Sequence, residues 1–534
     1  MRTGSLCLVL LVAVVAGSCK LPDEPGCAEG APCPPGQRCL VSEDPAAPAD
    51  SELDGVCAAV CQRSSDCDAL VPLCDRRDAV CRSCFPGEDA LCAGRSPETP
   101  SCDGGRCVAC RPPRGEASEA AECAARSDAA PVCDRAAARC RSCQRHGECD
   151  SGVCVKDASS ASAQHPVGSC LPSSEVLVVD PSLCSGIGPV FCTPAQALQR
   201  IDATHRHVLL RRSAEPTDFS DLTIGGLPAQ QGLDVRLIGP LADRPPHTAE
   251  TTPSTVLGGV VGHDALIVKT KARVTVEGLY FLGARSAIAC TGPDASVRIL
   301  RSLIAGSETA VSVASGCSLG VEESWLGRGP DGSAFLSVPA NVRGIDVSGS
   351  DFRIVNSVLV DNGNYARDAF GGVRVHSLGG KARSLILNST LYQQTGVKKL
   401  DKYFTSVLCD LVVGDQLVIM NTLFLGDKAL LTAPEEHYVD TICGAALRHV
   451  ASNDPLLASG DSLVLPMDVA PLVSAPKRDL RPSLRSNEGV ALQQSGTVRA
   501  DVGGQGFSAP LVDLTGQPRP SDRVTVGAFE AVVP

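Results

Sequence analysis

The hydrophobic pattern of the chain changes near residue 175. Before that point, long apolar runs are few, and Pro, Asp, Arg and Ala are frequent. After it, short stretches of alternating apolar and polar residues recur between Gly, Asp and Asn, which is typical of β-strands. Helical periodicity is limited to a turn or two at 193–201. We therefore expect an all-β domain over residues 175–534, preceded by a loop-dominated region.

The β region contains an internal repeat. Six segments share an apolar–x–apolar strand, two further residues that are usually Ser or Thr, and a second apolar strand. They begin at Val274, Val297, Leu319, Phe352, Leu385 and Leu417. A repeat of strands without helices predicts a solenoid whose coils stack at the spacing of paired strands, about 4.8 Å.

Stacking these segments predicts two columns of side chains. The inward aliphatic column consists of Val276, Ile299, Val321, Ile354, Leu387 and Ile419. The polar column at the bend consists of Ser302, Ser324, Ser357, Thr390 and Thr422, with Asn356 and Asn421 beside it. Short hydroxyl side chains satisfy backbone groups at turns, so we interpret the polar column as structural rather than as a ligand site.

Three passages extend this picture beyond the repeat. They are "VVDPSLCSGIGPVFCTPAQALQRI" at the start of the region, "SNDPLLASGDSLVL" at 452–465 and "DLTGQPRPSDRVTVGAFE" at 513–530. With these passages the region resembles right-handed parallel β-helix proteins of the pectin-lyase-like group. The resemblance implies an all-β solenoid. It does not fix an activity, because this fold carries lyases, hydrolases, adhesins and binding proteins.

Cysteine density marks the first region. Of the 28 cysteines, 22 lie between Cys27 and Cys192. Repeated P-x-C-D and C-x-x-C motifs predict four-cysteine units 67/74/81/84, 92/102/107/110 and 123/133/140/143, each closing on itself with two bridges. Zinc is the alternative for the C-x-x-C pairs, and we expect disulfides, with no metal and no cofactor. The series resembles the cysteine-rich repeats of exported myxobacterial lipoproteins, and we interpret it as a stalk or interaction segment.

The N-terminus predicts export. Arg2 precedes an apolar run from Leu6 to Ala16 that is too short to span a bilayer, which is typical of a secretory signal at residues 1–18. "AGSC" resembles the lipobox of bacterial lipoproteins, which implies lipidation of Cys19; a soluble secreted protein is the alternative. We therefore expect a lipid anchor in the outer membrane or at the cell surface. Cysteine-rich repeats then occupy residues 19–154 and a linker occupies 155–174.

Composition narrows the class of partner. The formal net charge is −12 and the pI is about 5.3, which argues against nucleic acid as a partner. Lyases of the resembled group use acidic calcium ligands with an Arg base, and its hydrolases use closely spaced Asp residues with G-H-G and R-x-K segments. Neither set is present in this sequence. The pair His263 and Asp264 is interpreted as a solvated turn, and Arg353 as an outward strand residue.

Long insertions after the second strand of successive coils provide a candidate binding surface. They carry aromatic and charged residues, which suit sugar rings and acidic glycans. The candidate glycan-binding residues are Tyr365, Arg367, Asp368, Lys398, Lys399, Lys402 and Tyr403. We expect a binding or adhesion scaffold for polysaccharide or cell-surface components. A polysaccharide lyase or glycoside hydrolase with a non-standard site is the alternative.

The late cysteines provide a test of the coil register. Cys184 and Cys192 flank a short loop and are predicted to pair. Cys409 and Cys443 lie 34 residues apart, close to one long coil, and are also predicted to pair. The sequence places Cys290 and Cys317 out of register, so we expect them to pack as small apolar residues.

Overall fold

The computed structural model describes most of the chain between residues 33 and 530. The residues outside the description are 1–32, 41–55, 76, 78, 112–120, 125–126, 135, 159, 185–189, 212–216, 219, 244–255, 259, 261, 330–340, 363–369, 394–404, 427–437, 455–456, 458–460, 467–471, 475–478 and 531–534. The chain forms two compact parts, 1–123 with 133–141, and 124–132 with 142–534. No described helix has the length and apolar character needed to cross a membrane.

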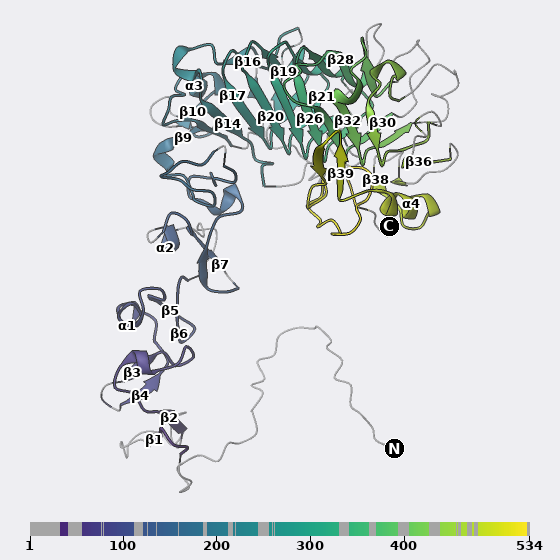
Figure 1. The fold of residues 1–534 in the computed structure, drawn as a ribbon. Helices are drawn as coiled ribbons and strands as arrows, with labels where there is room; N and C mark the ends of the chain where they lie inside the picture. The colour runs from purple at the N-terminus through teal and green to yellow at the C-terminus, as the bar shows by residue number, and fades with distance from the viewer. Residues whose placement is uncertain are drawn as a thin grey trace, which may run out of the picture. The chain divides into compact units, whose positions relative to one another are not determined.

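The larger part contains three long parallel sheets, and from β11 (His207–Leu210) to β33 (Leu423–Gly426) successive strands of the chain belong to successive sheets (Figure 1). Sheet 1 has the order β10 (Val190–Phe191), β9 (Val176–Val179), β11 (His207–Leu210), β14 (Asp234–Ile238), β17 (Arg273–Glu277), β20 (Ser296–Leu300), β23 (Ser318–Glu322), β26 (Asp351–Val355), β29 (Ser384–Leu387), β32 (Leu417–Met420) and β34 (Ala446–Arg448). The coils that begin with β11 through β29 each pass once through every sheet. The predicted fold class, an all-β parallel β-helix, is confirmed.

The other two sheets complete each coil. Sheet 2 has the order β12 (Thr217–Asp218), β15 (Val256–Gly258), β18 (Tyr280–Leu282), β21 (Leu303–Ala305), β24 (Trp325–Gly327), β27 (Val358–Val360), β30 (Thr390–Gln393), β33 (Leu423–Gly426), β35 (Ala451–Ser452) and β36 (Leu463–Val464). Sheet 3 has the order β13 (Leu222–Ile224), β16 (Leu266–Lys269), β19 (Ser286–Thr291), β22 (Thr309–Val313), β25 (Arg343–Ser348), β28 (Phe370–Ser377) and β31 (Val407–Cys409). Helix α3 (Pro194–Leu198) precedes β11 and packs Ala197 and Leu198 into the core at the first coil.

The inward column of sheet 1 differs from the prediction at one coil. The register pairs Ile354 with Ile386 and Ile386 with Ile419, so Ile386 occupies the predicted place of Leu387. Leu387 instead lies on the outer face in a second apolar cluster. The run Leu385–Ile386–Leu387 is apolar at every position, so alternation alone does not distinguish its two faces.

The bend after sheet 1 contains a ladder of hydroxyl side chains. Each hydroxyl donates to the carbonyl two residues earlier, at distances between 2.8 and 2.9 Å. The ladder consists of Ser302, Ser324, Ser357, Ser389 and Thr422. The prediction of Thr390 in this column is wrong by one residue, because Thr390 pairs with Val358 in sheet 2. The ladder supports the structural interpretation of the polar column.

The residue before each hydroxyl adopts a left-handed backbone conformation. The φ angles are 45° at Arg301, 49° at Glu323, 53° at Asn356, 45° at Asn388 and 49° at Asn421. Asn tolerates this region better than most residues. The sequence Asn388–Ser389–Thr390 has the N-x-S/T pattern of a glycosylation acceptor, but Asn388 is fully buried, so we interpret the pattern as part of the coil corner.

The cysteine-rich region consists of units in which the first cysteine pairs with the third and the second with the fourth. The bridges are Cys61–Cys74 with Cys67–Cys81, Cys84–Cys102 with Cys92–Cys107, Cys110–Cys133 with Cys123–Cys140, and Cys143–Cys154 with Cys149–Cys170. A further bridge joins Cys33 and Cys57. The predicted grouping is shifted by one cysteine, because each C-x-x-C motif straddles two units. Its first Cys closes one unit and its second Cys opens the next.

Each of these units contains a short hairpin that carries its third and fourth cysteines. The hairpins are β3 (Leu73–Asp75) with β4 (Val80–Arg82), β5 (Ser101–Asp103) with β6 (Arg106–Val108), and β7 (Val132–Asp134) with β8 (Arg139–Arg141); β1 (Gln37–Leu40) pairs with β2 (Val56–Ala59) before them. Helices α1 (Asp89–Arg95) and α2 (Ala121–Ala124) lie between hairpins. In the fourth unit, Cys154 and Cys170 form the corresponding antiparallel bridge.

The fourth unit has a longer hairpin loop than the others. Residues 155–169, which make up most of the predicted linker 155–174, lie between its third and fourth cysteines, Cys154 and Cys170. Val155 and Ser169 are fully buried, and the Val155 amide donates to the Ser169 carbonyl. The polar composition of this stretch led to the linker prediction, whereas the Cys149–Cys170 bridge closes it into a compact loop.

Candidate functional site

The fourth cysteine unit, Ser142–Leu171, covers the first coils of sheet 1. It packs Val153, Val155 and Leu171 against Ile238 and Ala242 of the β-helix in one apolar cluster. The unit and the β-helix also belong to the same compact part. The outer face of sheet 1 is therefore covered at this end by the cysteine-rich region.

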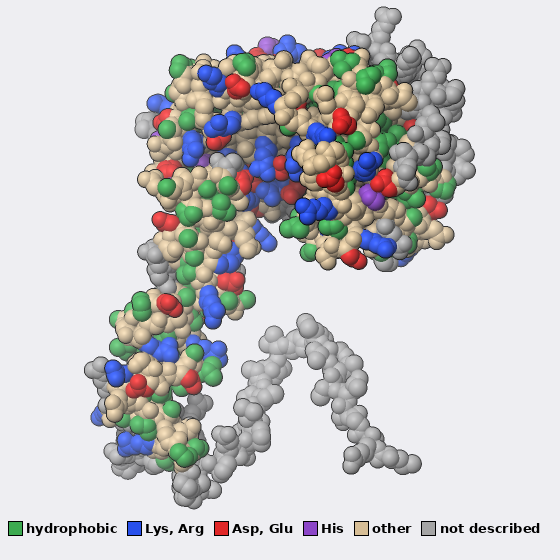
Figure 2. Space-filling model, viewed as in Figure 1, with side chains coloured by type: hydrophobic (Ala, Val, Ile, Leu, Met, Phe, Trp, Pro, Cys, Tyr) green, Lys and Arg blue, Asp and Glu red, His purple; other side chains and the backbone are tan. Residues whose placement is uncertain are grey.

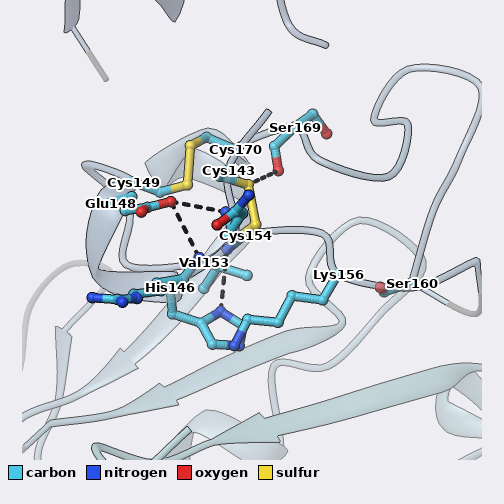
Figure 3. Close-up of a disulfide and its surroundings, with 12 residues drawn as sticks. Cys143, His146, Glu148, Cys149, Val153, Cys154, Lys156, Ser160, Ser169 and Cys170 are labelled. Carbon is cyan, nitrogen blue, oxygen red and sulfur yellow. Dashed lines mark hydrogen bonds between the residues drawn. A yellow bond between two sulfur atoms is a disulfide. The ribbon is translucent and has the colours of Figure 1, made fainter. Parts of the chain in front are cut away.

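A buried carboxylate lies at the centre of this contact. Glu277, at the end of β17, has no exposed surface. His146 Nε2 lies 3.2 Å and Lys156 Nζ lies 3.3 Å from Glu277 Oε1, and Arg301 also contacts this oxygen. Figure 3 shows His146 and Lys156 extending from the unit beside its two disulfides. Buried charges are tolerated when they are paired, as here.

The protonation states follow from this geometry. His146 Nδ1 accepts a 3.1 Å hydrogen bond from the Cys154 amide, which leaves Nε2 to carry the proton toward Glu277. Burial lowers the pKa of His146 and keeps the ring neutral. Burial also opposes the charge on Glu277, but His146, Lys156 and Arg236 together hold the pKa of its carboxyl well below the ordinary value.

The C-terminal segment covers the other end of the same face. The hairpin of β39 (Arg499–Val502) and β40 (Gln505–Ser508) packs Val502 and Phe507 on Leu385, Leu387, Val418 and Met420. It belongs to a C-terminal extension that also contains β37 (Leu472–Ser474), β38 (Asp479–Pro482) and α4 (Asn487–Ser495). Figure 1 shows β39, β38 and α4 together, below β26 and β32 in this view. The asparagines at the coil corners hydrogen-bond to this extension. The side-chain amides of Asn356 and Asn388 donate to its backbone carbonyls, and Asn421 both donates to and accepts from the backbone of Thr497.

Between the two covers, the outer face of sheet 1 forms a groove. Its floor includes a row of paired residues on β20, β23 and β26, namely Arg298, Gly320 and Arg353. Glu322 lies in the next row, and its side chain is 27% exposed. Figure 2 shows the surface hollowed here, with basic and acidic side chains inside the hollow. Three strand spacings, about 14 Å, separate β17 from β26, which is a suitable width for one extended glycan chain.

Some arginines of the groove form ion pairs with carboxylates, and one does not. Arg298 binds Glu322 with two nitrogens, at 3.1 and 2.8 Å, and its Nη1 lies 3.3 Å from Asp157 of the fourth unit. Arg301 pairs with Glu277 and lies 3.6 Å from Glu323. Arg353 is exposed and has no side-chain partner among the described residues. An unpaired guanidinium in a groove is suited to bind a carboxylate, sulfate or phosphate group.

The pKa of the Glu323 carboxyl is raised, whereas that of Glu277 is lowered. Burial raises the pKa of Glu323, the neighbouring Glu322 and Glu277 raise it further, and Arg301 only partly offsets this effect. Among the described residues, groups of three potential metal ligands are found only as cysteine clusters, whose sulfurs form disulfides. The groove carboxylates instead pair with arginines, which gives the floor an ion-paired character.

The predicted glycan-binding residues lie outside the described residues. Tyr365, Arg367 and Asp368 belong to 363–369, and Lys398, Lys399, Lys402 and Tyr403 belong to 394–404. Cys19 also lies outside the description. In the chain, these two segments fall between a strand of sheet 2 and a strand of sheet 3, whereas the groove lies on sheet 1.

The other singled-out residues have structural partners. His263 Nδ1 lies 2.7 Å from Asp221, and both side chains are about half exposed. Asp264 is buried against Arg285 and the Ser286 amide, so the interpretation of a solvated turn fails for this residue. Sequence reasoning dismissed Arg353 as an outward strand residue. The sequence signal for the groove is one outward position of three successive repeats, which is occupied by Arg298, Gly320 and Arg353.

The late cysteines form three bridges. Cys184 pairs with Cys192, and Cys409 pairs with Cys443 at a Cα separation of 5.2 Å. Cys290 also pairs with Cys317, at 6.2 Å, contrary to the expectation that they remain unpaired. Cys290 lies in β19 and pairs with Val313 at the end of β22, and the turn between β22 and β23 brings Cys317 back to Cys290.

Comparison with known proteins identifies similarities of limited extent. A family of unknown function, DUF8331, matches residues 44–176, which include all four of the units with two bridges. No curated protein matches the chain. The structure of pectate lyase Pel9A is similar over 67% of this chain and 96% of its own, with 13% identity and a TM-score of 0.33. A complex of XylC with xylose is similar over 61% of this chain and 65% of its own, with 8% identity and a TM-score of 0.30.

Proposed function

We propose that this chain is a binding protein whose groove on sheet 1 takes an acidic polysaccharide. The observation that carries the proposal is Arg353, an exposed guanidinium without a described partner on the floor of a groove with two covered ends. Arg298 and Glu322 beside it offer polar edges for sugar hydroxyls. A rigid sheet holds these groups at fixed spacing, which reduces the entropy lost on binding.

The disulfides mark an extracytoplasmic protein, because such bridges persist outside the reducing cytosol. We propose in addition that Cys19 carries a lipid that holds the chain at the outer membrane or cell surface. Fractionation of a Cys19→Ala variant tests this: release from the membrane fraction is expected, and continued sedimentation with membrane contradicts the anchor.

A polysaccharide lyase or glycoside hydrolase is the second candidate, and Glu323 is the observation that favours it. A carboxyl with a raised pKa beside Glu322 provides the proton donor that glycan cleavage requires. The binding function remains the first choice, because Glu322 is held by both oxygens to Arg298 and is a poor base in that state.

The experiment exposes the purified full-length chain to acidic and neutral polysaccharides, and scores binding and chain cleavage. We expect binding to an acidic polymer without cleavage. Arg353→Ala should weaken that binding at least tenfold, about 1.4 kcal/mol, because an ionic contact is lost. Arg200→Ala, at an exposed arginine on the first coil, is the matched control and should bind normally. Product formation would favour the enzyme, and equal binding by Arg353→Ala would remove the groove from consideration.

A further inference from the structure

Gly320 is an unusual residue for its position in the groove. It lies in the middle of β23, in a regular ladder that pairs it with Arg298 on one side and Arg353 on the other. Glycine weakens a strand interior, because it loses more backbone freedom on folding and offers no side chain for packing. A glycine at this place therefore needs a reason.

The usual structural reasons do not apply to Gly320. Its φ is not positive, and its ladder contains no bulge. A Cβ built on Gly320 would lie 3.5 Å from the nearest atom, Arg298 Cγ, which is ordinary van der Waals contact. The other atoms within 4 Å of that Cβ would be Glu322 Oε1 at 3.8 Å and Arg298 Cα at 3.9 Å, so a side chain fits here without a clash.

Other glycines in the three sheets contrast with this one. A Cβ on Gly344 would lie 2.0 Å from the Gly372 carbonyl oxygen, and one on Gly372 would lie 1.9 Å from the Ser406 carbonyl oxygen. A Cβ on Gly327 would lie 1.8 Å from the Val360 carbonyl oxygen. Packing excludes a side chain at each of those positions, whereas a Cβ at Gly320 would make only ordinary contacts with Arg298 and Glu322.

We propose that Gly320 is a ligand-contact position, at which a sugar ring of the bound polysaccharide lies directly against the backbone of β23. The inference rests on the proposed function and adds where and how the ligand sits. With no side chain at Gly320, Arg298 and Arg353 flank a flat opening on the sheet. Two strand spacings, about 10 Å, separate the backbones that carry these arginines. An acidic substituent of the ring then reaches Arg353, and ring hydroxyls reach the Arg298–Glu322 pair.

This placement predicts opposite effects on stability and binding. Gly320→Val introduces a residue that favours strands, in a space that already accepts a Cβ. We expect its midpoint of thermal unfolding to equal or exceed that of the wild type. Its side chain fills the opening between the arginines, so affinity should fall at least tenfold. Gly320→Ala, with a smaller side chain, should lose less affinity.

The test uses the full-length chain with polygalacturonate, alginate and heparin as acidic probes and dextran as a neutral probe. Ser312→Val is the matched control, since Ser312 is an outward mid-strand residue on sheet 3, and it should bind like the wild type. If wild type binds a probe and Gly320→Val binds it equally, the inference is overturned while the proposed function stands. If Gly320→Val unfolds at a lower temperature, Gly320 is structural and the inference also fails. If the wild type binds no probe, both fail.

Discussion

At the scale of single residues, the two ends of the groove depend on buried ion pairs. Arg519 of the C-terminal extension is buried and contacts the Glu530 carboxylate. Its Nη2 donates to Asn356 Oδ1 at 2.9 Å and to the carbonyl oxygens of Gly527 and Ala528. One guanidinium therefore joins a coil corner to the last residues of the described chain. Burial lowers the pKa of Arg519 despite the neighbouring Glu530 and Asp513.

Arg519→Met should destabilise the C-terminal extension by about 3–5 kcal/mol, because Glu530 is left buried and unpaired. Urea unfolding combined with limited proteolysis measures the loss. We expect cleavage within 472–530 before the β-helix unfolds. The double variant Arg519→Met/Glu530→Gln removes the unpaired charge and should recover part of the loss. Equal protease resistance of wild type and Arg519→Met would show that the pair does not hold the extension.

At the scale of elements, attachment of the fourth cysteine unit should depend on pH. His146 of the unit faces Glu277, Lys156 and Asp243, and burial lowers the pKa of its ring. His207 lies on β11, where burial first, then Arg236, Arg206 and the unit's His146 and His165, lower its pKa to about 3. Both rings must therefore stay neutral while the unit is attached.

The sign follows from linkage. A histidine whose pKa is lowered in the attached state binds fewer protons there than when released, so attachment is fully favourable above pH 6.5 and weakens as the pH falls. For His207, lowering the pH from 6.5 to 5 should cost about 2 kcal/mol. Hydrogen exchange should show faster exchange in 142–171 at pH 5 than at pH 7.5, after correction for intrinsic rates. His207→Gln should reduce the difference between the exchange rates at the two pH values. Equal corrected exchange rates of the wild type at pH 5 and pH 7.5 would contradict a pH-dependent attachment of the unit.

Element by element, the sequence predicts the fold better than the site. Strand alternation and the 22- to 33-residue repeat predict a parallel solenoid because every coil must bury the same aliphatic column. In the coil that begins at Leu385 the predicted register is off by one residue, at Leu387 and Thr390, because both faces of β29 are apolar and the C-terminal hairpin that covers the outer face is distant in sequence. The shifted cysteine units and the compact loop 155–169 have the same origin, because pairing depends on neighbours in space.

At the scale of the whole molecule, the groove depends on segments far apart in the chain. Its floor comes from three coils, and its covers come from the fourth cysteine unit and the C-terminal extension. Because these segments are far apart in the chain, no local motif in the sequence indicates the groove. Aromatic and charged residues in the insertions indicated 365–368 and 398–403 instead. The DUF8331 match ends at residue 176, where β9 begins, and thus includes the unit that covers the first coils.

Binding of the ligand on sheet 1 is tested by hydrogen exchange of the full-length chain with and without an acidic polysaccharide. We expect slower exchange in β20, β23 and β26, around Arg298, Gly320 and Arg353, when the polysaccharide is bound. We expect little change in the segments 363–369 and 394–404. Protection confined to those two segments, with sheet 1 unchanged, would contradict binding at the groove and place the ligand on the segments themselves.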